Sequence, residues 1–80
     1  MRIPRDISAD DLIKVLKKYG FEVTRQKGSH IRLSKITEEG SFSITIPNHS
    51  PIKIGTLNNI LHQLSRILNI PKEELIEALI

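Results

Sequence analysis

The 80-residue chain contains no cysteine. Disulfide bonds and thiolate metal sites are therefore excluded, and the fold has to rest on packing, as is usual in the cytosol. Long apolar runs are missing as well. The segment from Met1 to Asp6 lacks the apolar core of a secretion signal, and no stretch approaches the roughly 18 apolar residues of a membrane span. We therefore expect a cytoplasmic protein with no membrane partner.

Several motifs of enzymes and metal sites are also absent. No P-loop, Rossmann glycine pattern or nucleophile elbow occurs. The histidines His30, His49 and His62 are separated by 19 and 13 residues, so no two of them have the spacing of a zinc-binding helix. We expect neither a metal site nor a bound cofactor.

The composition is that of an ordinary folded protein, with 39% hydrophobic and 26% charged residues. A chain of this length builds one core, so we expect a single domain over 1–80. Residues 14–35 contain seven basic residues and one acidic residue, a net charge of +6, and the rest of the chain sums to −3. A surface that binds a polyanion is one explanation for this asymmetry, and the solvated faces of a helix and a hairpin are the other.

Local signals predict a first helix at about 9–19. Ser8 is a favourable N-cap residue, and Asp11 stands three positions later, where a capping box has its acidic partner. Apolar residues then recur at helical spacing until Gly20, which suits a left-handed stop.

Alternation of apolar and polar residues then predicts three antiparallel strands that begin near Phe21, His30 and Ser41, with turns at 27–29 and 37–40. With helices on one side only, the other face of the sheet is open to water. Strict alternation assigns to that open face the residues Glu22, Thr24, Gln26, His30, Arg32, Ser34, Ser43 and Thr45.

Two helices are expected to follow. Thr56 is the predicted N-cap of the first, whose apolar stripe runs from Leu57 to Leu68, and Pro71 at a first helical position opens the second, which ends at Leu79. The predicted fold is therefore α+β, in the order α-β-β-β-α with a short additional C-terminal helix, and the helices cover one face of a three-stranded antiparallel sheet.

His30 is the residue most suited to chemistry. It follows Gly28 and Ser29 at the entrance of a strand and is flanked by Lys27 and Arg32. An imidazole that moves protons near neutral pH, placed among cations that bind phosphate, suits phosphodiester cleavage. From spacing alone, an exposed surface histidine without a catalytic role is the commoner explanation.

His49 lies between Pro47 and Pro51, in the loop that leads to the second helix. It could transfer a second proton or fix the loop through a hydrogen bond. We favour the structural role, because the loop is expected to lie away from the open face.

Three ordered blocks of sequence resemble the HicA (YcfA-like) toxin family. They are 25–33 (RQKGSHIRL), 46–49 (IPNH), and 55–57 (GTL) followed by 60–61 (IL). The similarity also takes in the opening segment 3–8 and the closing segment 71–75, so it covers nearly the whole chain.

The resemblance implies a double-stranded-RNA-binding-like fold, a metal-independent ribonuclease activity against mRNA with His30 as catalyst, and inhibition by a HicB-like antitoxin protein. The residues expected to contact RNA are Arg25, Lys27, Gly28, Ser29, Arg32 and Lys53. A noncatalytic RNA-binding module and a protein-interaction domain are the alternatives. The oligomeric state stays open, with a monomer as one option.

Overall fold

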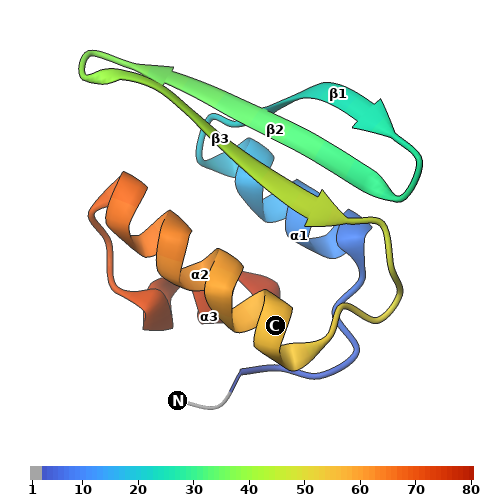
Figure 1. The fold of residues 1–80 in the computed structure, drawn as a ribbon. Coiled ribbons are helices and arrows are strands. Elements are labelled where there is room, and N and C mark those ends of the chain that lie inside the picture. The colour runs from blue at the N-terminus through green and yellow to red at the C-terminus, as the bar shows by residue number, and fades with distance from the viewer. Residues whose placement is uncertain (1–2) are drawn as a thin grey trace.

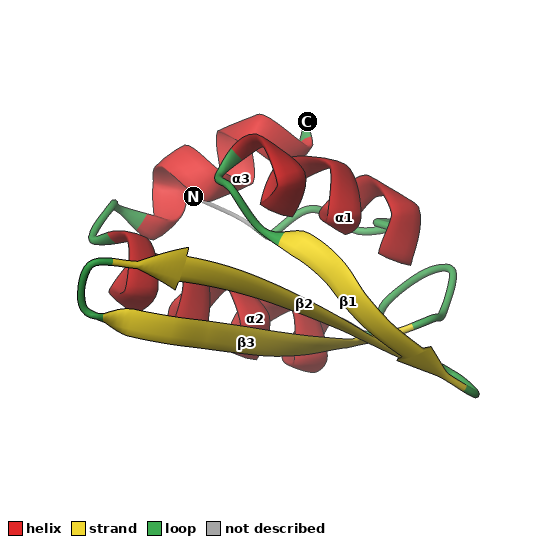
Figure 2. Ribbon diagram, turned by 90° about the horizontal axis from the view of Figure 1, so that it is seen from above, coloured by secondary structure: helices red, strands yellow, loops and turns green. Residues whose placement is uncertain are grey.

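The computed structural model describes residues 3–80 as one layer of helices packed under one sheet (Figure 1). The elements are α1 (Ala9–Lys18), β1 (Glu22–Lys27), β2 (His30–Thr37), β3 (Gly40–Pro47), α2 (Ile54–Leu68) and α3 (Lys72–Leu79). In Figure 2 the sheet lies nearest the viewer and α2 runs behind β2 and β3. The predicted α+β layout is confirmed. Met1 and Arg2, which belong to the segment inspected for a secretion signal, lie outside the described residues.

Helix α1 begins where the sequence predicts. The Asp11 N–H donates to Ser8 Oγ at 3.1 Å, and the Ser8 N–H donates to Asp11 Oδ2 at 3.0 Å, which completes a capping box. The hydrogen bonds from the Ser8 backbone and side chain lower the pKa of the Asp11 carboxyl group below its ordinary value. At the other end, Gly20 has a φ of +94°, a left-handed conformation that favours glycine.

The sheet is an antiparallel meander in the order β1-β2-β3. Strands β2 and β3 pair without interruption, from His30 opposite Pro47 to Thr37 opposite Gly40. The pairing of β1 with β2 is interrupted between Val23 and Arg25. One extra residue, Thr24, is therefore inserted in β1 as a β-bulge.

The bulge corrects the prediction for β1. The pairs that follow it are Arg25 with Arg32, Gln26 with Ile31, and Lys27 with His30. Residues directly opposite each other in an antiparallel pair have their side chains on the same face. Gln26 therefore shares the helix-facing side with the buried Ile31, and its assignment to the open face was wrong. Arg25 and Lys27 take its place on the open face.

The core lies between the sheet and the helices, and α3 packs against α1 and α2. Its fully buried side chains include Phe21, Leu12, Leu16, Leu33, Ile44, Ile46, Leu57, Leu61, Leu64 and Leu75. Among the described residues, no polar or charged side chain is buried. The helix-facing residues of β2 and β3 supply the sheet's share of this core, which leaves the open face for contacts with other molecules.

The N-cap of α2 differs from the prediction. The helix begins at Ile54 with Lys53 as its N-cap, so the assignment of Thr56 was wrong. The buried Ile52 explains the earlier start, because its N–H donates to Ile7 O at 2.8 Å and so fixes the chain immediately before Lys53.

The connection from α2 to α3 is close to the prediction. Asn69 ends α2 with a φ of +55°, in the left-handed region, and Ser65 Oγ donates to Ile70 O at 2.6 Å. Pro71, which the sequence predicted as the first helical residue, is the N-cap of α3, so the helix begins one residue later, at Lys72. No helix within residues 3–80 combines the length and the apolar character needed to cross a membrane.

Candidate functional site

The predicted site residues of the β1–β2 hairpin gather at one end of the sheet. Gly28 and Ser29 form its two-residue turn, and Gly28 has a φ of +57°. His30 is the first residue of β2, where it lies opposite Lys27 on β1 and Pro47 on β3. The turn and His30 are exposed, so a ligand can reach the imidazole without any change in the fold.

Basic side chains face each other across β1 and β2, and the pair of Arg25 and Arg32 carries like charges. Arg25 lies opposite Arg32, and Lys27 lies opposite His30; we call these four residues the basic face. Like charges directly opposite each other destabilise a sheet. No acidic residue occurs between Val23 and Thr37 to compensate them locally. An anion bound across the two strands would remove the repulsion, so the arrangement favours binding of a phosphate-bearing ligand.

A row of hydroxyl groups crosses the same face. Thr24 Oγ1 lies 3.2 Å from Ser34 Oγ, which in turn lies 2.9 Å from Ser43 Oγ. Arg32 Nη2 donates to Ser43 Oγ at 3.4 Å, which ties the row to the basic face. Hydroxyl groups both donate and accept hydrogen bonds, as contacts with phosphate oxygens and ribose hydroxyls require.

The positive charge of residues 14–35 is divided between the two layers. Lys14, Lys17 and Lys18 belong to α1 and its last turn, on the helix side of the sheet. Lys35 donates to Tyr19 O at the C-terminal end of α1, where a cation complements the helix dipole. Only Arg25, Lys27 and Arg32 of the seven cations therefore lie on the basic face.

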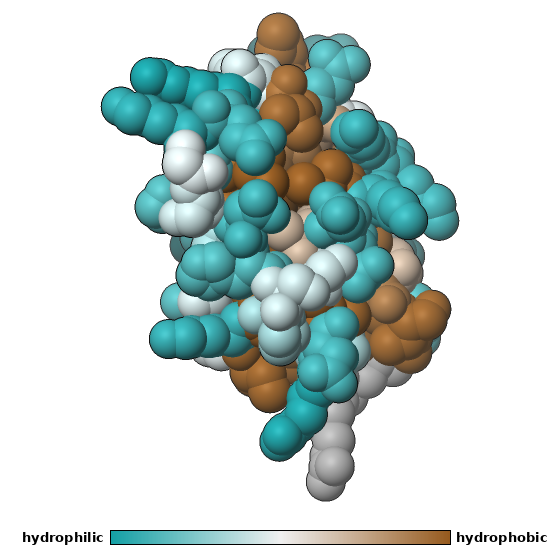
Figure 3. Space-filling view, turned by 90° about the vertical axis from the view of Figure 1, so that its right-hand side faces the viewer, coloured by the Kyte–Doolittle hydropathy of each residue, from teal (hydrophilic) through white to brown (hydrophobic). Residues whose placement is uncertain are grey.

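Lys53 is not part of the basic face. As the N-cap of α2 it belongs to the helix layer, where it is exposed. The first turn of α2 has no acidic residue and no side-chain cap, so the positive end of its dipole adds to the charge of Lys53. The start of α2 and the β1–β2 turn lie toward the same end of the molecule (Figure 1). Figure 3 views this end, whose surface is mainly hydrophilic with a few apolar patches.

The loop that carries His49 starts beside the β1–β2 turn. The Asn48 N–H donates to Ser29 O at 2.6 Å, and the loop then runs toward the helix layer, where the Ala9 N–H donates to His49 O at 3.2 Å. The expectation that this loop lies away from the open face is thus correct only for its second half. Its first half borders the site.

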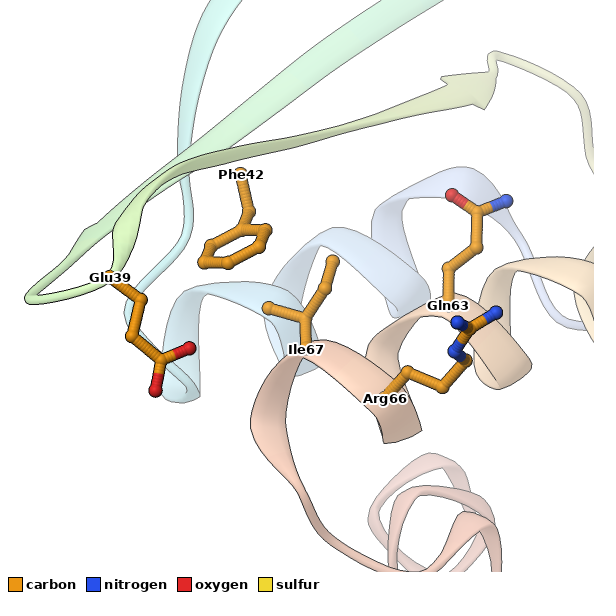
Figure 4. Close-up of a pocket in the computed structure, with 5 residues that line it drawn as sticks. All are labelled: Glu39, Phe42, Gln63, Arg66 and Ile67. Atoms are coloured by element: carbon orange, nitrogen blue, oxygen red, sulfur yellow. The ribbon is translucent and has the colours of Figure 1, made fainter.

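No cluster of metal ligands accompanies the basic face within residues 3–80. In that part of the chain, no three His, Cys, Asp or Glu side chains gather where they could hold a metal ion. A pocket of about 380 Å³ opens elsewhere, between the β2–β3 turn and α2 (Figure 4), and is lined by Glu39, Phe42, Gln63, Arg66 and Ile67. At roughly 3.3 Å per residue along β2, this turn lies about 23 Å from His30. None of the predicted site residues lines the pocket.

Comparison with known proteins assigns a family to the part of the chain that contains the basic face. A family model described as the HicA toxin of bacterial toxin-antitoxin systems matches residues 9–65, well over half of the chain. The matched region runs from the first residue of α1 almost to the end of α2, so it contains the entire sheet. No curated protein and no solved structure matches the chain.

Proposed function

The chain belongs to the HicA toxin family of bacterial toxin-antitoxin systems, and on that premise we propose that it is an mRNA endoribonuclease that binds RNA on the basic face and cleaves it with His30. The cross-strand pairs carry the proposal. Arg25 opposite Arg32 places two like charges across the strands, which opposes stable pairing of the sheet, and Lys27 lies directly opposite His30. An RNA backbone would neutralise the cations and bring a phosphate to His30.

The proposed reaction is transfer of the phosphate to the neighbouring ribose 2′-hydroxyl group. His30 accepts the 2′-hydroxyl proton as that oxygen attacks phosphorus. Lys27 and Arg32 flank His30 on the same face and neutralise the charge that builds up on the phosphate oxygens. The open surroundings of Gly28, where an added Cβ atom would meet nothing within 4 Å, let the RNA backbone approach the main chain of the turn.

Lys53 has a supporting role in this proposal. Its exposed position at the N-terminus of α2 extends the positive potential beyond the sheet, toward nucleotides on one side of the cleaved phosphate. Arg25 is the corresponding contact farther along the sheet, two residues from Lys27.

Family membership implies a HicB-type antitoxin as the partner of this chain. We propose that the antitoxin inhibits by laying an acidic surface over the basic face, because complementary charge speeds association and covers His30. RNA cleavage should then be absent in the complex, and His30 should be protected from small imidazole-modifying reagents.

Substitution of His30 by alanine tests the catalytic proposal, with His62→Ala as the matched control. Both histidines are exposed, and His62 lies on α2, where its Nε2 is 3.4 Å from Lys72 Nζ of α3. Each variant should keep its free energy of unfolding within about 0.5 kcal/mol of the parent. His30→Ala should lose RNA cleavage by a factor of about 10² to 10⁴ and keep RNA binding, while His62→Ala should cleave at the parental rate.

The reaction products and the negative outcomes of the same assay also test the proposed mechanism. Cleavage by the parent protein should survive EDTA and leave a 2′,3′-cyclic phosphate. A folded His30→Ala protein that cut RNA at the parental rate would eliminate His30 as the catalyst. A parent protein that bound RNA with a steep salt dependence and never cut it would be a noncatalytic RNA-binding module instead.

A further inference from the structure

A second histidine lies at the end of the sheet that carries His30. Pro47 is the residue of β3 directly opposite His30, and His49 follows two positions later. The Asn48 N–H donates to Ser29 O at 2.6 Å, so the chain on both sides of the histidines is tied together. His30 and His49 are therefore neighbours in the fold although 19 residues separate them.

The loop is held in place by main-chain groups. The His49 N–H donates to Pro47 O at 2.9 Å, and His49 O accepts from the Ala9 N–H at 3.2 Å. Three residues later the Ile52 N–H donates to Ile7 O, and the Ile52 side chain is buried in the core. Any residue other than proline at position 49 could supply these main-chain contacts, whereas the imidazole of His49 is exposed. A loop-fixing role for the imidazole, which the sequence favoured, is thus not what these contacts require.

The separation of the two histidines suits a single phosphate. Cα atoms opposite each other in an antiparallel pair are at most about 5.5 Å apart, and two further peptide units add at most about 7.6 Å. The Cα atoms of His30 and His49 therefore lie no more than about 13 Å apart. A phosphodiester bridges two imidazoles over such a distance when the ribose 2′-hydroxyl donates to one imidazole and the 5′-oxygen accepts from the other, each over about 2.6–3.2 Å.

The reaction involves two proton transfers. As the 2′-oxygen forms its bond to phosphorus, its proton passes to a base, while the bond from phosphorus to the 5′-oxygen breaks and that oxygen takes up a proton. The base starts neutral and the acid starts protonated, so two groups on opposite sides of the phosphate serve better than one. The products are a 2′,3′-cyclic phosphate and a free 5′-hydroxyl group.

Resting on the function proposed above, we propose that His49 is the general acid that protonates the 5′-oxygen leaving group while His30 acts as the base. The substrate phosphate lies at the end of the sheet, between the β1–β2 turn and the loop after β3, rather than flat on its centre. Lys27, directly opposite His30, neutralises the phosphate from the sheet side.

A leaving group that needs no proton separates the acid from the base. The substrate is an RNA oligonucleotide with one mapped cleavage site, prepared with the natural 5′-oxygen or with sulfur in its place, since a thiolate leaves without protonation. On the natural RNA, both His49→Ala and His30→Ala should lose a factor of about 10² or more in the cleavage rate constant. On the sulfur substrate, His49→Ala should come within about threefold of the parent, while His30→Ala stays impaired because the 2′-hydroxyl group still needs a base.

Two controls complete the experiment. His49→Gln replaces the imidazole by an amide that forms hydrogen bonds but carries no proton for transfer, so it should behave as His49→Ala does and serves if the alanine variant fails to fold. His62→Ala should match the parent on both substrates. Circular dichroism and urea unfolding establish that each variant is folded.

The possible failures are distinguishable. If His49 variants cut both substrates at the parental rate, or lose activity equally on both, His49 is not the acid, and the function proposed for His30 stands as long as His30→Ala is impaired. If the folded parent cuts neither substrate, the ribonuclease function falls and this inference falls with it.

Discussion

Replacing Arg25 with glutamate should stabilise the folded protein and weaken its binding to RNA. The β-bulge at Thr24 places Arg25 directly opposite Arg32, and both side chains are exposed. Strict alternation without the bulge would instead pair Arg25 with Ile31 on the helix side. The stability of charge-reversal variants therefore reports on the register from which the basic face is built.

The size of the effect follows from Coulomb's law. Two unit charges about 7 Å apart repel by about 0.6 kcal/mol in water, and a Debye length of about 8 Å at 0.15 M ionic strength reduces this to about 0.25 kcal/mol. Arg25→Glu turns repulsion into attraction of the same size, so it should raise the free energy of unfolding by about 0.5 kcal/mol at 0.15 M and by about 0.9 kcal/mol at 0.01 M ionic strength. Arg32→Glu should act in the same direction, reduced by the loss of its 3.4 Å hydrogen bond to Ser43.

The double variant is the control. With glutamate at both positions, a like-charge pair is restored, so the stability should return close to the parental value. The free energy of unfolding of the parent, the two single variants and the double variant is measured by urea unfolding at both ionic strengths. The unfolding midpoints are compared with one common slope of free energy against urea concentration. Additive effects of the two substitutions, or single variants that do not respond to salt, would show that the two side chains do not face each other. In RNA binding, Arg25→Glu should lower the salt slope by about 1.

Four further results are expected. The logarithm of the RNA association constant should fall with the logarithm of salt concentration with a slope of about −2 if the three cations of the basic face contact phosphates, against about −5 if all seven cations of residues 14–35 do; a flat response would exclude backbone binding. Gly28→Ala should cost about 1 to 2 kcal/mol in urea unfolding, because a φ of +57° strains alanine although its Cβ meets nothing, whereas the same change at the helical Gly55 should stabilise the protein by about 0.5–1 kcal/mol. Ser8→Ala should cost about 1 kcal/mol through loss of the α1 cap. The pKa of Asp11 is lower in the folded protein than in the unfolded chain, so the ionised carboxylate stabilises the fold fully above the ordinary carboxyl pKa. This stabilisation is lost as the pH falls through the lower folded-state pKa. In Asp11→Asn, the free energy of unfolding measured from pH 2 to 6 should therefore depend less on pH than in the parent.

The elements that sequence predicted well have their boundaries marked by local chemistry. Ser8 caps α1, Gly20 ends it in a left-handed conformation, and Gly28 forms the tight turn before His30. These signals act within a few residues, so their effects do not depend on the rest of the fold. The surroundings of His30 were predictable for the same reason, because turn and histidine are adjacent in sequence.

Features that depend on distant segments were not predictable. The run Thr24 to Lys27 is polar throughout, so no apolar residue marks which side of β1 faces the helices, and pairing with β2 decides. The start of α2 depends on the hydrogen bond from Ile52 to Ile7, which lies 45 residues away. The hydrogen bond between the His49 loop and the β1–β2 turn is likewise a tertiary contact, and no sequence pattern within the loop predicts it.

Helix α3 lies outside the region that matches the family, yet it closes the core. Leu75 and Ile76 are 0% and 2% exposed and belong to the same cluster as the helix-facing residues of the sheet. Loss of one buried leucine or isoleucine side chain commonly costs about 2–5 kcal/mol, against a total stability of about 5–15 kcal/mol for a typical protein. A stop codon after residue 65 would leave the basic face and both histidines intact in sequence while the chain failed to fold. Under selection against a toxin, nonsense mutations in codons 66 to 75, which remove Leu75 and Ile76, would therefore offer cells a route to survival that leaves the codons for His30 and His49 unchanged.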